Sequence, residues 1–341
     1  MTEQKDIQPL LEVKNLKVEF PTRRGNLVAV NDVSLYINPG EVLGVVGESG
    51  AGKSMTGNAI IGLLEPPGRI AAGEILLEGE RIDNLPYEQM RKIRGRRIGA
   101  IFQDPLTSLN PLYKVSFQLI ETIRTHLGMT ETQARKRALD LLEEVGIPGA
   151  KERIDHYPHQ FSGGMRQRVV IALALAAEPR LIIADEPTTA LDVSIQAQII
   201  SVLKRLCRDH GTAVMLVTHD MGVIAETADR VAVMYAGRIA EVGPVQDVVR
   251  KAKHPYTHGL MGSIPLVGHE VDALTQIDGS MPRLNAIPEG CAFNPRCEEV
   301  MGQCLQDRPE LQWVEQTQVS CHLFTESEAK AAKSEIGGEA S

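Results

Sequence analysis

Aromatic side chains are scarce in this chain of 341 residues, where Phe, Tyr and Trp together make up 4%. The core must therefore be filled mainly by aliphatic side chains. Hydrophobic residues make up 43% of the chain, which is ample for that purpose. The chain is long enough for one large domain with an appendage. We therefore expect a globular protein whose packing is dominated by aliphatic residues.

The sequence also lacks an apolar run long enough to span a bilayer, which takes about 18–20 residues. The richest stretch, Val169–Ala177, is too short. The first residues, Met1–Asp6, lack the basic and then apolar pattern of a secretory signal peptide. We therefore expect a protein that is made and kept in the cytoplasm and that reaches a membrane only through partners.

An excess of positive charge is missing too. The formal net charge is −8, which argues against binding to nucleic acid, because such binding needs a concentrated basic surface. The basic cluster Arg91–Arg97 is local, and we interpret it as a solvated face.

The most informative motif that is present is the octet Gly47–Ser54, which fits the pattern G-x-x-x-x-G-K-[ST]. The apolar run Glu41–Val46 before it predicts a short buried strand, and the residues after it predict a helix. A strand, a glycine-rich turn and a helix start together aim backbone N–H groups at phosphate. The loop is thus predicted to bind a nucleoside triphosphate, with Lys53 on the β- and γ-phosphates and the Ser54 hydroxyl on Mg²⁺. The predicted nucleotide-binding residues of this loop are Gly47, Glu48, Ser49, Gly50, Ala51, Gly52, Lys53 and Ser54.

Two carboxylates end a second apolar run, Arg180–Pro187. Such a run predicts a buried parallel strand that delivers acids to its carboxyl edge. Asp185 is expected to hold Mg²⁺ through the coordination shell of the ion. Glu186, pointing the other way on the strand, is expected to polarise an attacking water. The alternative, a strand followed by a solvated acidic turn, leaves the phosphate loop unexplained.

A second helix start that can bind an anion is predicted within Phe161–Arg168. Ser162 suits an N-cap, and the paired Gly163 and Gly164 precede an uninterrupted helical run over Met165–Ala177. A Ser-Gly-Gly helix directly upstream of an Asp-Glu strand resembles the signature of ABC ATPases. The family version usually begins Leu-Ser-Gly-Gly-Gln, so this chain keeps the Ser-Gly-Gly core and differs at the two outer positions.

The resemblance extends to three further positions and implies their roles. Gln103 resembles the glutamine-loop residue that senses the γ-phosphate and the metal and lies near a membrane partner. Asp192, in Ala190–Asp192, resembles the D-loop at a dimer seam, and His219 resembles the switch histidine that orients the water. The implied catalytic residues are Glu186, His219 and Gln103, and the implied Mg²⁺ ligands are Ser54, Gln103 and Asp185.

Phe20, at the end of the first predicted strand, has two interpretations. In one it stacks on adenine, as the family's aromatic residue does, and in the other it is a core residue. The loop after it is longer than is usual for the first role, and the sequence leaves both interpretations open.

The predicted fold is α/β, an ABC-type P-loop NTPase with a mixed sheet core. Alternating apolar residues predict an antiparallel β subdomain over residues 11–47 and a strand pair at 74–82. A helical insert is expected at about 87–160, with Thr130 as an N-cap, and alternating strands and helices over 181–241 are typical of a parallel sheet. The expected domains are the ATPase domain over residues 1–253, a small Cys-rich C-terminal extension over 254–324 and a disordered tail over 325–341.

Four of the five cysteines lie in the expected extension, at Cys291, Cys297, Cys304 and Cys321. Disulfides are rare in cytosolic proteins, and a loop-rich segment with little core needs another cross-link, so metal ligation is favoured over four inert thiols. Cys207 stands alone in a predicted helix and is interpreted as a core residue. The spacing alone names no metal, because it matches neither the paired C-x-x-C of zinc sites nor the ferredoxin patterns.

Three segments indicate a subgroup within the family of ABC ATPases. His254–Thr257, Asp104–Pro111 and Gly290–Cys297 resemble segments of the ATPases of dipeptide, oligopeptide and nickel importers. Members that resemble the D-type ATPase of dipeptide permeases carry a 4Fe–4S cluster on cysteines in this arrangement. The resemblance therefore implies a 4Fe–4S cluster on the four clustered cysteines, with Zn²⁺ as the alternative.

The implied function is ATP hydrolysis that drives import of di- or oligopeptides through separate membrane subunits. Each nucleotide is expected between the phosphate loop of one ATPase and the Ser162 helix end of a second, paralogous ATPase. The other implied partners are two transmembrane permease subunits and a periplasmic or extracellular substrate-binding protein, with this chain peripheral at the cytoplasmic face of the inner membrane. An ATPase of the same kind that drives import of nickel or another small solute remains an open alternative. A soluble, non-transport ABC ATPase is the alternative of another class, but those that act on DNA carry a long insertion that this sequence lacks.

Overall fold

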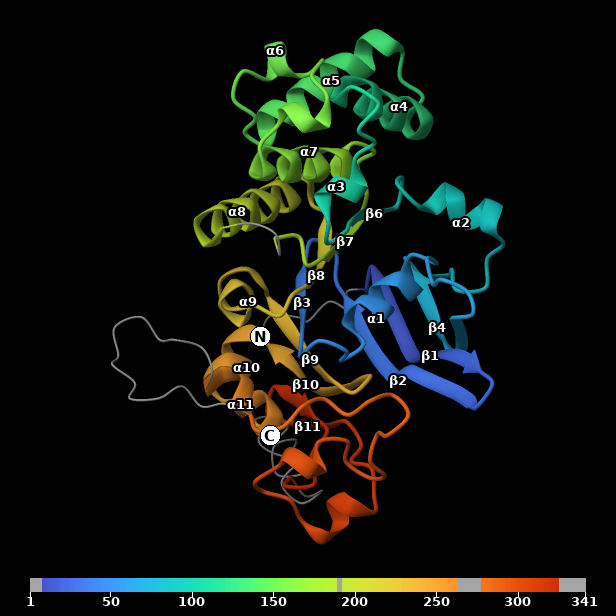
Figure 1. Ribbon diagram of the computed structural model, residues 1–341, viewed down its shortest axis with the longest axis vertical. Helices are drawn as coiled ribbons and strands as arrows, with labels where there is room; N and C mark the ends of the chain where they lie inside the picture. The colour runs from blue at the N-terminus through green and yellow to red at the C-terminus, as the bar shows by residue number, and fades with distance from the viewer. Residues whose placement is uncertain (1–7, 189–191, 263–276, 325–341) are drawn as a thin grey trace, which may run out of the picture.

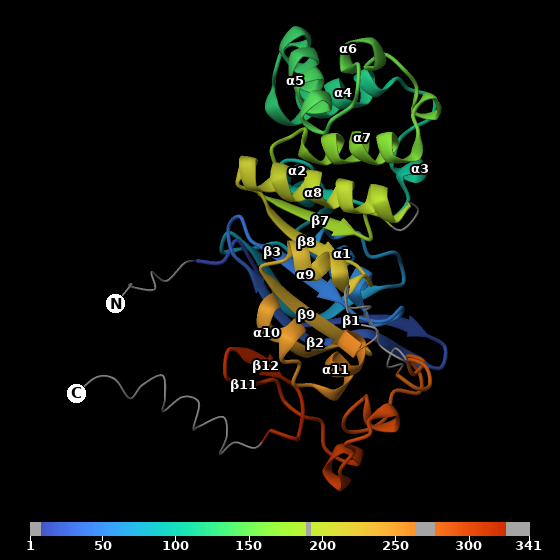
Figure 2. The same cartoon turned by 90° about the vertical axis from the view of Figure 1, so that its left-hand side faces the viewer.

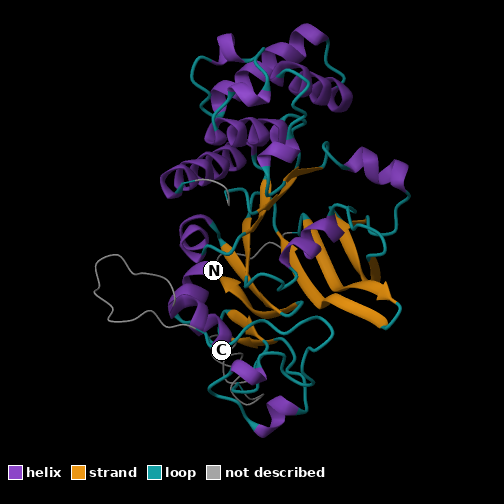
Figure 3. Cartoon of the chain, viewed as in Figure 1, coloured by secondary structure: helices purple, strands orange, loops and turns teal. Residues whose placement is uncertain are grey.

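The computed structural model describes residues 8–188, 192–262 and 277–324, which form two sheets and a group of helices (Figure 1). A four-stranded antiparallel sheet has the order β2-β1-β4-β5, and an eight-stranded mixed sheet has the order β11-β12-β10-β9-β3-β8-β7-β6. Figure 3 shows that helices form one end of the molecule and that the two sheets lie beyond them. The tail over 325–341, expected to be disordered, lies outside the described residues.

The strands of the antiparallel sheet are β1 (Leu11–Thr22), β2 (Gly25–Ile37), β4 (Arg69–Leu77) and β5 (Glu80–Arg81). Buried and more exposed residues alternate along parts of β1 and β2, so one face of this sheet packs inward. Glu78 and Gly79 form the turn between β4 and β5 with φ values of 53° and 80°. This turn confirms the strand pair predicted at 74–82.

The strands of the mixed sheet are β3 (Val42–Val46), β6 (Ile98–Ile101), β7 (Leu181–Asp185), β8 (Ala213–Val217), β9 (Arg230–Tyr235), β10 (Arg238–Pro244), β11 (Gln312–Val314) and β12 (Thr317–Val319). The strands β9, β3, β8, β7 and β6 are parallel, and β10, β12 and β11 pair antiparallel. β3, β7 and β8 are nearly continuous runs of buried aliphatic residues, as a sheet covered on both faces requires. The predicted mixed sheet is confirmed.

The α-helices are α1 (Lys53–Ile60), α2 (Tyr87–Ile93), α3 (Pro105–Ser108), α4 (Val115–Leu127), α5 (Glu131–Glu144), α6 (Ala150–Arg153), α7 (Gly163–Leu175), α8 (Val193–His210), α9 (Met221–Thr227), α10 (Val245–Arg250) and α11 (Pro255–Gly262). Short 3-10 turns are η1 (Pro158–Gln160), η2 (Asn294–Arg296) and η3 (Gly302–Leu305). α7 packs against α3, α4, α5 and α8, which forms a helical layer at one end of the molecule (Figure 2). In the part of the chain that the structure describes, no helix combines the length and apolarity of a membrane span.

The start of α5 follows directly from its sequence. The Thr130 side chain accepts a hydrogen bond from the Gln133 N–H, and the Thr130 N–H donates to the Gln133 side chain at 3.0 Å. This reciprocal pair is a capping box, so the predicted N-cap is confirmed. Gly146, with a φ of 78°, lies just past the helix end. The buried face of α5 consists of Ala134, Ala138, Leu141 and Leu142.

One strand lies inside the segment expected to be a helical insert, residues 87–160. β6 pairs in parallel with β7 and forms the edge of the large sheet. A four-residue apolar run does not distinguish a strand from a turn of helix, and only the pairing with β7 decides the matter. The helical part of this segment therefore resumes after β6, with α3.

After residue 254 the chain returns to the large sheet, which was not predicted from the sequence. β11 and β12 form a hairpin with Glu315 at a φ of 55°, and β12 pairs with β10, where Val319 lies opposite Glu241. The buried Glu241 carboxylate accepts hydrogen bonds from the backbone N–H groups of Lys253 and His254. Strand pairing and a buried carboxylate thus fix the C-terminal segment to the sheet.

Replacement of Leu141 by alanine tests the packing of the helical layer. Leu141 is fully buried, so Leu141→Ala leaves a cavity and is expected to lower the free energy of unfolding by about 2–5 kcal/mol. Chemical denaturation measures this loss. Lys136→Ala, on the exposed face of the same helix, is the control and is expected to stay within about 0.5 kcal/mol of wild type. Equal losses in the two variants would contradict the buried packing of Leu141.

Candidate functional site

The phosphate loop joins β3 to α1 through a turn that depends on glycine. Gly47, Gly50 and Gly52 have φ values of 148°, 84° and 101°, and Gly52 is the N-cap of α1. A Cβ at position 47 would lie 2.2 Å from the carbonyl oxygen of Met234, closer than real Cβ atoms approach. The turn therefore places the N-terminus of α1 next to the end of β3, as the motif predicts.

Lys53, the first residue of α1, lies inside the loop and is 6% exposed. Its ammonium donates hydrogen bonds to the carbonyl oxygens of Gly47 at 2.8 Å and Glu48 at 3.1 Å. Burial lowers the pKa of Lys53, and nearby carboxylates oppose this shift in the order Glu186, Asp185 and Glu48. The charge of Lys53 is thus stabilised by acids rather than by bulk water.

Ser54 and Asp185 meet at the end of β7. The Ser54 hydroxyl donates a hydrogen bond to Asp185 Oδ1 at 3.0 Å. Burial raises the pKa of Asp185, and the hydrogen bond from Ser54 opposes the rise. The charge of Glu186 adds to the rise, and the charge of Lys53 opposes it. A hydroxyl and a carboxylate are oxygen ligands of the kind that Mg²⁺ prefers.

Glu186 lies beyond β7 in the left-handed backbone region, with a φ of 46°. Its N–H donates to the carbonyl oxygen of Val217 at 2.8 Å, which holds the turn. The strand alternation that was expected to point Glu186 away from Asp185 therefore does not apply. Both carboxylates instead act electrostatically on Lys53.

Gln103 and His219 both reach Glu186. Gln103, just after β6, donates from Nε2 to Glu186 Oε2 at 3.0 Å, and His219 Nδ1, just after β8, lies 3.4 Å from Glu186 Oε1. The carboxyl ends of neighbouring parallel strands share one edge of a sheet, so β3, β8, β7 and β6 deliver these side chains to one site. The predicted residues that the structure brings together here are Ser54, Gln103, Asp185, Glu186 and His219.

The second predicted phosphate-binding helix end lies elsewhere in the chain. Ser162 is the exposed N-cap of α7, with its Oγ 3.4 Å from the Met165 N–H that donates to it. Gly163 and Gly164 form the first turn of this helix. α7 belongs to the helical layer and lies apart from α1 in both views (Figures 1 and 2). The two predicted phosphate-binding helix ends of the chain therefore lie at separate places.

Two further predicted nucleotide contacts lie in other elements. Asp192 is exposed at the N-cap position of α8, and its neighbours Ala190 and Leu191 lie outside the described residues. Phe20, in β1, packs against Gly68, where a Cβ would come within 2.6 Å of the ring. This contact supports the core interpretation of Phe20, and its stacking on adenine stays a prediction.

All five cysteines lie in the described part of the chain as free thiols. Cys207 is buried in α8, and burial raises its pKa to about 12. Burial also raises the pKa of Cys291, Cys297 and Cys321. Among the described residues, no group of three or more His, Cys, Asp or Glu side chains is arranged to hold a metal ion. The 4Fe–4S cluster and the alternative Zn²⁺ therefore stay predictions.

Two residues that contact the phosphate loop were not predicted from the sequence. The Tyr256 hydroxyl accepts a hydrogen bond from the Glu48 N–H at 2.9 Å, and Arg296 forms an ion pair with the Glu48 carboxylate at 3.0 Å. Arg296 and Glu48 are 248 positions apart, and a single sequence has no pattern that links such distant positions. The segment His254–Thr257 indicated a family but not this contact.

Two family models match the chain. The model of the ABC transporter family matches residues 30–189, which include the phosphate loop and the Asp185–Glu186 pair. The model of the oligopeptide/dipeptide transporter C-terminal region matches residues 240–304.

Curated relatives match nearly the whole chain. The oligopeptide transport ATP-binding protein OppD of Haemophilus influenzae is 48% identical over 305 residues, covering 89% of this chain and 94% of its own. The dipeptide transport ATP-binding protein DppD of the same organism is 46% identical over 313 residues, covering 92% and 95%. The oligopeptide transport ATP-binding protein AppD of Bacillus subtilis is 45% identical over 323 residues, covering 94% and 98%.

Solved structures share the fold of the ATPase part. The ATP-binding cassette MJ0796, solved as a dimer in a post-hydrolysis state bound to ADP and Pi, gives a TM-score of 0.62 at 31% identity, covering 69% of this chain and 98% of its own. CbiO1 from Clostridium perfringens, part of the ABC transporter complex cbiONQ, gives a TM-score of 0.61 at 28% identity, covering 71% and 91%. Together with the identity to the curated relatives, this likeness shows that the chain belongs to the ATP-binding proteins of ABC transporters, in the oligopeptide/dipeptide transporter group.

Proposed function

We propose that this chain is the ATP-hydrolysing subunit of an ABC importer for di- and oligopeptides, coupled to separate membrane permease subunits. The relatives OppD, DppD and AppD are named as peptide transport ATP-binding proteins, and the match covers 94–98% of their length. One observation carries the proposal. The phosphate loop and the acids Asp185 and Glu186 meet at one edge of the sheet, while the second anion-binding helix end, at Ser162, stays apart. In this proposal a single chain supplies only half of each nucleotide site.

The residues present fit a triphosphate with Mg²⁺. The loop N–H groups and the N-terminus of α1 attract phosphate oxygens, and Lys53 exchanges its carbonyl partners for the β- and γ-phosphates. The Ser54 and Asp185 oxygens, 3.0 Å apart, are suitable metal ligands, with Gln103 as the third. When bound, Mg²⁺ neutralises charge that develops on the phosphates.

We propose that Glu186 activates the attacking water. A carboxylate can accept the proton of the water as it attacks the γ-phosphate. Gln103 and His219 hold the two carboxylate oxygens from opposite neighbouring strands, so they orient Glu186 and the water together. The Glu186 carboxylate also acts electrostatically on Lys53, so the two groups belong to one charged site.

A second ATPase chain completes the site in this proposal. The Ser162 helix end of one chain faces the phosphate loop of the other, with Asp192 at the seam, and MJ0796 is an example of such a cassette solved as a dimer. We propose a paralogous ATPase as the partner. Closing the dimer excludes water and strengthens the contacts of Lys53 with the phosphates. Hydrolysis weakens these contacts, so the halves part.

Glu186→Gln is expected to separate ATP binding from hydrolysis. The amide cannot accept a proton, whereas the phosphate loop is unchanged, so MgATP binding is retained and turnover falls by about 10²–10⁴-fold or more. Phosphate release and binding of a fluorescent ATP analogue measure the two effects. Glu143→Gln, on the exposed face of α5, is the control and is expected to hydrolyse ATP at the wild-type rate. Normal hydrolysis by Glu186→Gln would refute the assigned role.

We propose that exposed hydrophobic residues of the segment that contains Gln103 form one apolar face, which is our candidate for the permease contact. Its members are the exposed hydrophobic residues Phe102, Leu112, Tyr113, Phe117 and Tyr157. Leu112 is 80% exposed, and the rings of Tyr113 and Phe117 stack with their centroids 4.8 Å apart. Clustered exposed aromatic residues are typical of protein contact sites. A permease loop on this face would sense the site through Gln103, which bonds Glu186.

Phe117→Asp tests this contact. A carboxylate on the apolar face opposes its burial against a permease, so ATP-driven uptake of a labelled dipeptide is expected to fall about tenfold or more. Uptake is measured in proteoliposomes that contain both ATPases and both permeases, supplied with the substrate-binding protein, in which the wild-type complex is expected to import the peptide. Tyr87→Asp changes an exposed aromatic residue of α2 and is the matched control, with uptake at the wild-type level. Equal uptake in the two variants would count against the face.

The names of the relatives support our proposals for the cargo and for the location in the cell. Their names favour peptide over nickel or another small solute, and a model of a transporter region favours an importer over a soluble ABC ATPase. We propose two permease subunits, a periplasmic or extracellular substrate-binding protein, and a peripheral location at the cytoplasmic face of the inner membrane. The proposed domains are the ATPase domain over residues 1–253 and the small Cys-rich extension over 254–324.

We also propose a 4Fe–4S cluster on Cys291, Cys297, Cys304 and Cys321. Burial raises the pKa of Cys321 to about 11, and the charges of the other three thiols add to the rise, so the four sulfurs lie within electrostatic range of one another. The Asn294 N–H donates to the Cys291 carbonyl oxygen at 3.0 Å, and the Cys291 N–H donates to the Cys304 carbonyl oxygen at 2.9 Å, so the backbone holds Cys291 and Cys304 next to each other. A cluster spreads its thiolates over separate irons, whereas Zn²⁺ needs all ligands within about 2.3 Å of one ion. When bound, the cluster cross-links a segment with little core of its own.

Anaerobic purification tests the cluster. About four irons and four acid-labile sulfides per chain are expected, since each of the four thiolates binds one iron. Cys304→Ser is expected to lose most of the iron, and Cys207→Ser is the control that keeps it, because Cys207 lies buried in α8. A colourless protein that contains zinc would contradict the cluster and support Zn²⁺, the alternative metal.

A further inference from the structure

Glu48, in the phosphate loop, is contacted by two elements that follow residue 254. Its backbone N–H donates to the hydroxyl of Tyr256 in α11 at 2.9 Å. Its carboxylate oxygens accept hydrogen bonds from Arg296 Nη1 at 3.0 and 3.1 Å. Both contacts come from the part of the chain beyond residues 30–189, the range that matches the ABC transporter family model. The phosphate loop is therefore held by the C-terminal segment as well as by the ATPase fold.

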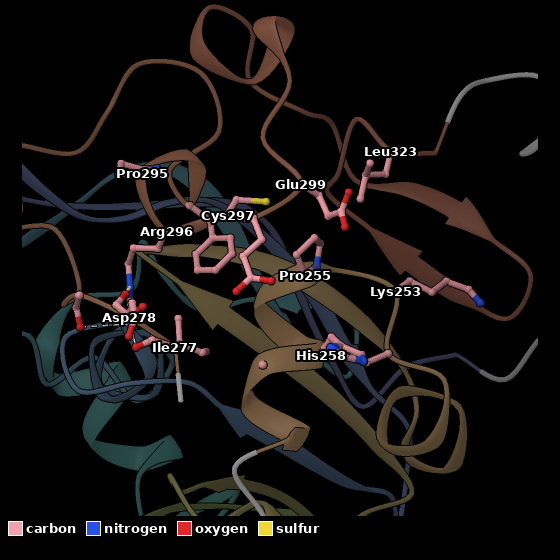
Figure 4. A pocket seen from close by; sticks show the side chains of 15 residues that line it. Lys253, Pro255, His258, Ile277, Asp278, Pro295, Arg296, Cys297, Glu299 and Leu323 are labelled. Atoms are coloured by element: carbon pink, nitrogen blue, oxygen red, sulfur yellow. Dashed lines mark hydrogen bonds between the residues drawn. The ribbon is translucent and has the colours of Figure 1, made fainter. Parts of the chain in front are cut away.

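Arg296 is fixed from several sides, and its side chain is 8% exposed. Its Nε donates to the carbonyl oxygen of Asp278 at 2.7 Å, and its Nη2 donates to that of Ile277 at 3.3 Å. Arg296 and Cys297 are among the residues that line a hollow of about 730 Å³, and Figure 4 labels both side chains. A guanidinium has five N–H donors in fixed directions, so these carbonyls determine where the remaining donors point. Nη1 points at the Glu48 carboxylate and also lies 3.4 Å from the Tyr235 hydroxyl, while Nη2 also lies 3.5 Å from the Gly279 carbonyl oxygen.

An aromatic cluster supports both contacts with Glu48. The fully buried Tyr256 ring lies with its centroid 4.7 Å from that of Tyr235 and 5.4 Å from that of Phe293. The Arg296 guanidinium lies 5.9 Å from the centroids of both Tyr235 and Phe293. Ring packing and cation–π contacts of this kind restrict the motion of the side chains that make them. The position of Arg296 relative to the loop is thus determined by the C-terminal segment.

The Glu48 carboxylate acts on the phosphate-binding end of the loop. It is one of the charges that raise the pKa of Lys53, so its field reaches the ammonium group expected to bind the phosphates. A triphosphate carries several negative charges, and an uncompensated carboxylate at this place repels it. The ion pair with Arg296 cancels most of that repulsion, because the pair is only partly exposed and weakly screened.

We propose that Arg296 is a positioning residue for ATP binding: it neutralises the Glu48 carboxylate at the phosphate loop, and the C-terminal segment thereby sets the affinity of the loop for ATP. Arg296 acts through Glu48 and needs no contact with the nucleotide. The inference rests on ATP binding at this loop and is independent of the cargo. Because Arg296 adjoins Cys297, a single side chain links the cysteine-bearing segment to the nucleotide site.

ATP binding and hydrolysis by the full-length Arg296→Gln variant test the proposal. The dissociation constant for MgATP is expected to rise about tenfold, as when one member of a partly buried ion pair is removed and the other keeps its charge. KM for ATP is expected to rise with it, while kcat stays within about twofold of wild type. Adding Glu48→Gln is expected to restore most of the affinity, because the unpaired carboxylate is gone. A merely structural role predicts a further loss in the double variant.

Arg308→Gln is the matched control. Arg308 lies in the same C-terminal segment and pairs with Asp32 of β2 at 3.0 Å, but both side chains are exposed. Its loss is expected to leave ATP affinity at the wild-type level. An equal loss of affinity in Arg308→Gln, or wild-type affinity in Arg296→Gln, would overturn the proposal.

A variant that fails to fold is recognised by thermal unfolding without nucleotide. If Arg296→Gln fails, Arg296→Lys decides, with ATP affinity expected within about threefold of the wild-type level because the positive charge beside the Glu48 carboxylate is kept. A tenfold loss of affinity in a folded Arg296→Lys variant would then contradict charge neutralisation. Normal ATP binding without peptide uptake, in contrast, would count against the proposed importer and not against the role of Arg296.

Discussion

The parallel pairing of β3, β8, β7 and β6 is the constraint on which the nucleotide site depends. The carboxyl ends of parallel strands share one edge of a sheet, so segments that are far apart in sequence end at the same place. The phosphate loop follows β3, Gln103 follows β6, the acid pair lies at the end of β7 and His219 follows β8. The surrounding layers can differ in detail without moving these side chains, provided that the register of the four strands is kept.

The backbone strain at Glu186 is small, and the strained turn brings the Glu186 carboxylate close to Lys53. A left-handed conformation at a residue other than glycine costs about 1–2 kcal/mol, and Glu186 adopts one. The hydrogen bond from its N–H to Val217 contributes about 0.5–1.5 kcal/mol, so the local terms nearly cancel. The turn brings a second carboxylate to Lys53, whose buried charge needs nearby acids because it is removed from water.

The C-terminal segment is part of the frame of the site. β12 extends the large sheet beside β10, and Glu241 in β10 anchors the start of α11. From there Tyr256 and Arg296 reach Glu48, so packed rings and one ion pair join this segment to the phosphate loop. The contacts with Glu48 are the physical basis of the role proposed for Arg296.

The sequence by itself determined the features that need only neighbouring residues. The glycine turn at Gly47–Ser54, the capping box at Thr130 and the Ser162 helix end all follow from local spacing, because each involves groups within a few residues of one another. Tertiary structure alone decided that residues 98–101 form a strand and that Phe20 packs on Gly68. It also decided that Glu186 turns toward Lys53 and that Arg296 reaches Glu48. These outcomes depend on partners tens to hundreds of positions away, and one sequence without its fold contains no signal that pairs them.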